Sequence, residues 1–265
     1  MKVCYYYQSF VGLHQILKDP HYTDLIIVSS IHFGLNKEKQ PHIYLNDNLP
    51  HDPIFDKVWT ECHALANQGV QIHLMVGGAG GAYDVLFKDY ETYYPMLADL
   101  LRNKTFISGV NLDIEEVVHL SDVYKLITDL KKDFTELDIT LAPVQSSLES
   151  DDPGMGGFSY KELWTHMKDN IDMLNVQAYE SFSYESFETI VKNGYPPEKI
   201  ILGLESGQFT KDSFKVALGV IKKIMSKYPT FGGVYDWEYL NAPPLGPKDP
   251  SEFSRLMKSV TCDDD

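Results

Sequence analysis

Polar and apolar residues alternate along the segment Ser108–Glu116, which has the sequence S-G-V-N-L-D-I-E-E. Alternate side chains of an extended strand point to the same side, so Asn111, Asp113 and Glu115 are expected to share one face. Two carboxyls buried beside each other resist full ionisation, so we expect them to share one proton and the pKa of one to rise. A carboxyl in that state is suited to general acid catalysis near neutral pH. Glu115, at the far end of the segment, is best placed to protonate a leaving group, and a structural ion-pair network without turnover is the alternative.

Eight strand-sized apolar runs supply the elements that would position these groups. Segments with helical periodicity separate them, and each presents one apolar stripe that would pack on a sheet. This alternation over about 250 residues predicts an α/β fold, a single-domain (β/α)8 TIM barrel over residues 1–265, with residues 262–265 a frayed tail. A doubly wound open sheet is the structural alternative, but the first turn, Tyr7–Gly12, has no glycine-rich phosphate-binding pattern. The expected strands are Val3–Tyr7, Asp24–Ile31, Val70–Val76, Gly109–Glu115, Asp138–Val144, Asp172–Ala178, Lys199–Glu205 and Phe231–Trp237.

Charge and composition limit the class of partner. The 265 residues include 23 Lys and Arg against 38 Asp and Glu, a formal net charge of −15, which repels nucleic acid and anionic membranes. No apolar run approaches the ~20 residues that span a bilayer, and the N-terminus lacks the apolar core of a signal peptide. We therefore expect a cytoplasmic protein, or a secreted one if a signal peptide has been removed. The three cysteines and nine histidines show no disulfide or metal-ligand spacing, so neither a metal nor another cofactor is expected.

Four segments, each on a different expected strand, resemble motifs of glycoside hydrolase family 18, the chitinase and endo-N-acetylglucosaminidase family. The family pattern D-G-x-D-x-D-x-E stands here as S-G-V-N-L-D-I-E, with Ser108 and Asn111 in place of aspartates. The other three are H-L-M-V-G-G at 73–78, with Met75 in the place of a serine, Q-A-Y-E at 177–180, and G-G-V-Y-D-W-E-Y at 232–239. These motifs occur in the expected order and cover the whole barrel.

The resemblance implies roles for particular residues. Glu115 would be the general acid and then base, Asp113 would hold the substrate's 2-acetamido group, and Tyr179 would donate a hydrogen bond to the acetamido oxygen. Trp237 would form the floor under the sugar. The substrate's own carbonyl oxygen would be the nucleophile, the substrate-assisted exception to the two-carboxylate scheme. Further substrate-binding candidates are Asn111, Gln177, Tyr6, Phe33, Gly77 and Gly78.

Several of these positions have simpler alternatives. Tyr6 and Phe33 suit barrel filling as well as sugar stacking, and Gly77 and Gly78 suit a tight strand end. Asn111 removes a charge beside Asp113 but keeps an acceptor and adds donors, so it is expected to orient that carboxylate. Glu116 and Glu180 are expected to be loop or rim residues.

The leading functional hypothesis is a retaining hydrolase that cleaves β-1,4 N-acetylglucosamine linkages, in a chitin-like polymer or in the core of N-linked glycans. The expected partner is accordingly an oligo- or polysaccharide containing N-acetylglucosamine. The short turn Ser206–Phe209 leaves no room for the α+β insertion that walls the cleft of many family members, which predicts an open groove. The alternatives are a catalytically silent lectin, inhibitor or storage protein on the same barrel, and an unrelated barrel enzyme acting on a phosphorylated substrate. The latter should show a glycine-rich anion site after the last two strands, which Glu205–Gly207 does not supply.

Overall fold

A computed structural model describes residues 1–260 of the protein. The expected tail at 262–265, together with Cys262, lies outside the described residues.

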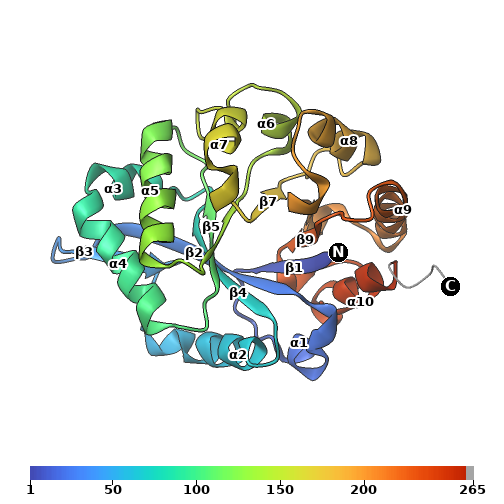
Figure 1. The fold of residues 1–265 in the computed structure, drawn as a ribbon. Helices are drawn as coiled ribbons and strands as arrows, with labels where there is room; N and C mark the ends of the chain where they lie inside the picture. Colours follow the sequence, from blue (N-terminus) through green and yellow to red (C-terminus); the bar gives the residue numbers. More distant parts are fainter. Residues whose placement is uncertain (261–265) are drawn as a thin grey trace.

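Eight parallel strands form a closed barrel, because each strand pairs with the next and β1 pairs with both β2 and β9. Figure 1 shows these strands at the centre of the molecule with the helices around them. The single-domain (β/α)8 TIM barrel predicted from the sequence is confirmed. The barrel strands are β1 Lys2–Tyr7, β2 Leu25–Leu35, β4 Gln71–Gly77, β5 Gly109–Asp113, β6 Asp138–Leu141, β7 Met173–Val176, β8 Ile200–Glu205 and β9 Gly233–Trp237.

The helices pack their apolar stripes on the outside of the barrel. Ser159 caps the N-terminus of α7, because its hydroxyl accepts a 3.1 Å hydrogen bond from the amide of Glu162. Within residues 1–260, none of the helices has the length and apolar character needed to cross a bilayer. The helices are α1 His14–Lys18, α2 Asp56–Ala66, α3 Tyr83–Lys88, α4 Tyr90–Asn103, α5 Leu120–Asp133, α6 Gln145–Glu149, α7 Tyr160–Met167, α8 Tyr184–Lys192, α9 Lys211–Lys227 and α10 Glu252–Ser259.

Strand alternation divides the core into two layers. Side chains such as Tyr5 and Tyr7 point outward and pack against the helices, whereas Tyr6 points inward. The barrel is therefore filled by side chains and has no open channel. The interior cluster contains Cys4, Tyr6, Leu25, Ile27, Met75, Met173, Ile201 and Tyr235, with Tyr179 and Trp237 packed on it.

Three features differ from the sequence expectation or refine it. Strand β2 continues past Ile31 to Leu35 and pairs antiparallel with β3 (Pro41–Leu45), a hairpin that the sequence analysis missed. Strand β5 ends at Asp113, short of Glu115, because its neighbours β4 and β6 also end here and leave no backbone to pair with. The connection after β8 is a single 3-10 turn, Ser206–Gln208, followed at once by α9, so the insertion is absent as predicted.

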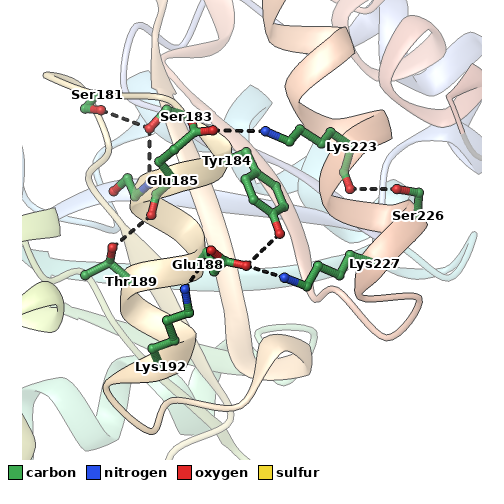
Figure 2. Close-up of polar contacts among 11 residues, drawn as sticks. Ser181, Ser183, Tyr184, Glu185, Glu188, Thr189, Lys192, Lys223, Ser226 and Lys227 are labelled. Atoms are coloured by element: carbon green, nitrogen blue, oxygen red, sulfur yellow. Dashed lines mark hydrogen bonds and ion pairs between the residues drawn. The ribbon is translucent and has the colours of Figure 1, made fainter.

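Polar contacts fasten α8 to α9 on the outside of the barrel (Figure 2). Glu188 accepts hydrogen bonds from Lys192 at 2.8 Å and from Tyr184 at 2.7 Å, and it also pairs with Lys227. The ammonium groups of Lys192 and Lys227 lower the pKa of Glu188 to about 2. This network holds helix α8, whose first turn forms one wall of the groove described below.

Candidate active site

A cavity of about 910 Å³ opens at the carboxyl ends of the barrel strands. Barrel enzymes keep their active sites at this end, because the loops that follow the strands converge there. Eight of the ten candidate residues from the sequence line this cavity: Glu115, Asp113, Tyr179, Gln177, Trp237, Phe33, Gly77 and Gly78.

Asp113 and Glu115 form the central pair. Asp113 is the last residue of β5 and its side chain is buried, while Glu115 follows the strand end and is partly exposed to the cavity. Burial raises the pKa of Asp113 well above its ordinary value, and the neighbouring carboxyl of Glu115 raises it further by charge repulsion and a hydrogen bond. That this pair shares one proton stays a prediction of the alternating motif.

Gln177 connects the two carboxyls. Its side-chain nitrogen, Nε2, donates to Oδ1 of Asp113 and to Oε1 of Glu115, both at 3.2 Å, and to the backbone oxygen of Ala142 at 3.0 Å. Gln177 follows strand β7, on the opposite side of β6 from β5. The amide fixes the orientation of both acidic groups from one side and leaves the rest of the Glu115 carboxyl to the cavity.

Asn111 and Tyr6 lie one layer deeper, below the cavity, and do not line it. Both are buried: the Tyr6 hydroxyl donates to Oδ1 of Asn111 at 3.0 Å, and Asn111 Nδ2 donates to Oγ1 of Thr140 at 2.8 Å. The orientation of Asp113 that the sequence analysis assigned to Asn111 is thus supplied by Gln177. Neither Asn111 nor Tyr6 is placed to touch a sugar in the cavity.

Tyr179 and Trp237 sit on top of this interior layer. The Tyr235 hydroxyl donates to the Tyr179 oxygen at 3.1 Å, which leaves the Tyr179 hydrogen available to a group in the cavity. Burial raises the pKa of Tyr179 well above its ordinary value, so the phenol keeps its proton. The Trp237 ring is tilted over the Tyr6 ring with the centroids 5.1 Å apart, and its other side belongs to the cavity wall.

Glycines 77 and 78 end strand β4 in a conformation that favours glycine. Their φ angles are +95° and +88°, and a Cβ on Gly78 would lie 2.7 Å from the end of the Met75 side chain. The Gly78 amide donates to the backbone oxygen of Asp113 at 2.9 Å. These glycines therefore both make the tight strand end and bring the cavity wall close to Asp113.

Phe33 has two environments. It is 6% exposed, and its ring packs edge-on against Tyr93 with the centroids 5.6 Å apart. It also lines the cavity. Both roles left open by the sequence, core packing and contact with a ligand, are compatible with this position.

Glu205 is a cavity residue that sequence reasoning missed. It ends strand β8 beside Trp237 of β9 and lies in the inward-pointing register of Ile201 and Gly203. The sequence did offer one indication of this role, since Glu205 is an acidic residue at the carboxyl end of an expected barrel strand. The cavity is also lined by His32, Gln8 and Asn46. In the sequence, these residues were marked only by their position in a loop or in the hairpin that was not recognised.

A second hollow of about 860 Å³ continues the groove over the loops after β6, β7 and β8. It shares Gln177, Tyr179 and Glu205 with the first cavity, so the two hollows adjoin, and Asp113 and Glu115 line the first of them. Glu180, expected at the rim, lines this second part. Across residues 1–260, no group of three or more His, Cys, Asp or Glu side chains is arranged to hold a metal ion.

Solved structures resemble this chain over its whole length. A fungal endo-β-N-acetylglucosaminidase from glycosyl hydrolase family 18 superimposes with a TM-score of 0.85 at 28% identity, covering 98% of both chains. The chitinase ChiC from Aspergillus fumigatus gives 0.83 at 28% identity, covering 98% of this chain and 99% of its own. A family 18 chitinase from Pseudoalteromonas aurantia shares the fold, with a TM-score of 0.70 at 18% identity over 99% of each chain.

Comparisons with protein-family models and with curated proteins give no match. The structural likeness is nevertheless full-length, and it agrees with the four strand motifs found in the sequence. The chain therefore has the barrel fold of glycoside hydrolase family 18, the fold of its chitinases and endo-β-N-acetylglucosaminidases.

Proposed function

We propose that the protein is a glycosidase that cleaves β-1,4 linkages of N-acetylglucosamine, in chitin-like chains or in the core of N-linked glycans. The observation that carries the proposal is the arrangement of Glu115 and Asp113, both bonded to Gln177, in a cavity that also contains Tyr179 and Trp237. The similarity to both an endo-β-N-acetylglucosaminidase and a chitinase supports this substrate class.

The proposed reaction uses the acetamido group of the substrate. Glu115 donates its proton to the glycosidic oxygen as the bond from that oxygen to C1 breaks. The acetamido oxygen attacks C1 while Asp113 accepts a hydrogen bond from the acetamido N–H and Tyr179 donates one to the oxygen. Glu115 then removes a proton from a water that attacks C1 and breaks the bond between C1 and the acetamido oxygen. The product therefore keeps the β configuration, and Glu115 regains its proton.

The shape of the groove favours internal cleavage. Gln177, which is bonded to both acidic groups, lines both hollows, and the short connection after β8 adds no insertion there. A chain or glycan can therefore be bound along its middle. We expect intermediate oligomers among the first products of a chitin oligomer, whereas the early formation of disaccharide alone would contradict internal cleavage.

The deciding experiment compares a chitin oligomer and an N-glycan as substrates, with product masses read by mass spectrometry and the first anomer by NMR. Cleavage of either with β product supports the proposal. Binding without cleavage over a broad pH range would replace it with a silent lectin. An α first product would reject the acetamido nucleophile, because inversion needs a second carboxylate that activates water across the ring.

A further inference from the structure

Glu116, the residue after the proposed acid, has its carboxylate bound to the backbone at the start of helix α3. Its Oε1 accepts hydrogen bonds from the amides of Ala82 and Tyr83, both at 2.5 Å, and its Oε2 accepts one from the amide of Asp84 at 3.2 Å. Hydrogen bonds to an ionised acceptor are the stronger kind. The Glu116 side chain is therefore held in place by three hydrogen bonds, although the sequence suggested only a loop or rim residue.

The backbone that Glu116 holds is the end of the cavity wall made by the loop 77–82. The loop is fixed at its other end by the Gly78 amide, which donates to the Asp113 oxygen at 2.9 Å. In between, the ring of His32 bonds the Gly81 oxygen through Nδ1 at 2.6 Å. Gly81 has a φ of +71°, and a Cβ there would lie 3.3 Å from Oε2 of Glu116, so carboxylate and loop are in close contact.

These contacts join the wall of the cavity to the chain that carries the acid. Asp113 holds one end of the loop, Glu116 holds the other, and Glu115 lies between them beyond the end of β5. No strand pairing fixes the backbone at Glu115. The position of Glu115 therefore depends on the hydrogen bonds that Asp113 and Glu116 accept on either side of it.

We propose that Glu116 is a positioning residue, which sets the distance between the Glu115 carboxyl and the bond to be cleaved by tying the Glu115 segment to the end of the loop 77–82 and the start of α3. This inference rests on the proposed glycosidase function. Misplacing a catalytic group by about 1 Å can cost about 10²-fold in rate. The loss should fall on kcat more than on KM, because the walls that bind the sugar are supplied by other residues as well.

The test compares Glu116→Ala and Glu116→Gln with a matched control, Glu61→Gln. The Glu61 carboxylate also accepts a backbone amide, that of Leu13 at 2.8 Å just before α1, but Glu61 does not line the cavity. We expect kcat to fall about 10²-fold in Glu116→Ala and about 10-fold in Glu116→Gln, which keeps one acceptor oxygen at the same reach, with KM changed far less. Amide hydrogen exchange at residues 82–84 should accelerate only in the Glu116 variants. Glu61→Gln should keep the wild-type kcat.

All rates are measured per folded molecule, with the folded fraction taken from circular dichroism at the assay temperature. If Glu116→Ala fails to fold, Glu116→Gln carries the test. A kcat in the Glu116 variants equal to that of Glu61→Gln would overturn the inference and leave the proposed function intact. Wild-type protein that cleaves neither substrate would overturn both, and this outcome is visible before any variant is examined.

Discussion

The hydroxyl of Tyr6 donates a 3.0 Å hydrogen bond to Oδ1 of Asn111 in the interior of the barrel. Asn111 occupies the place of a family aspartate, and its amide nitrogen is also engaged, with Thr140. The amide is therefore part of the barrel filling beneath the cavity, and its hydrogen bonds go to Tyr6 and Thr140 and not to Asp113.

Asn111→Asp should shift the acidic limb of the pH–rate profile to higher pH. A further buried carboxylate repels the charged form of Asp113, whose pKa burial and Glu115 already raise. We also expect a loss of about 1–3 kcal/mol in the free energy of unfolding at neutral pH, because a buried charge lacks full compensation. The pH–rate profile and urea denaturation check both. An unchanged profile would show that Asn111 only fills space, and Asn193→Asp, at the end of α8, serves as the control.

Glu115→Gln should abolish most turnover while ligand binding survives. Glutamine keeps the size and can still contact Gln177 but cannot donate a proton to the leaving group, and such catalysis is worth about 10²–10⁴ in rate. Turnover is measured by product formation, and binding of a chitin oligomer by calorimetry. Residual activity above about a tenth of wild type would remove Glu115 from the role of acid.

Tyr179→Phe should lower kcat by about 10²-fold, the usual effect of deleting one donor to a developing charge. Tyr235→Phe is the matched variant, because it removes only the hydrogen bond that Tyr235 donates to Tyr179. We expect a much smaller loss there. Equal losses in both variants would indicate that the tyrosine pair maintains packing and that the free Tyr179 hydroxyl contributes nothing specific.

Asp236→Asn should become more stabilising as pH rises. Asp236 is fully buried on the outward face of β9. Ser206 donates to its Oδ2 at 2.6 Å, and its Oδ1 has no hydrogen-bond partner among residues 1–260. Burial raises the pKa of Asp236 well above its ordinary value of 3.8. Above pH 3.8 the folded chain thus binds a proton that the unfolded chain has released, and its free energy of unfolding falls as pH rises toward the raised pKa.

Asparagine removes this ionisation and keeps an acceptor for Ser206. Relative to wild type, the variant should gain on the order of 1 kcal/mol in unfolding free energy between pH 4 and pH 8. Urea titrations at the two pH values measure the difference. The same stability difference at both would show that Asp236 does not change its protonation on folding.

The sequence by itself determined the barrel and its order of strands. Apolar runs of strand length are needed wherever a strand is buried on both faces, and all eight were recognisable for that reason. Period-2 alternation also placed Asp113 and Glu115 on one side of a strand, and both line the cavity. The hairpin β2–β3 was not recognised in the sequence because Pro41–Leu45 is short and only its last residue, Leu45, is fully buried. The segment therefore lacks the apolar run that marks a core strand.

Tertiary structure alone decided which polar groups meet. Gln177 is 64 residues from Asp113 in the chain, and Glu116 is 34 residues from Ala82, yet each pair is hydrogen-bonded. Local periodicity reports only which side of a strand a residue occupies. The side chain that a residue meets from another strand depends on the stagger of the strands in the closed sheet and on where each loop turns. For this reason Gln177 orients the acidic pair, whereas Asn111, which is nearer in the sequence, does not.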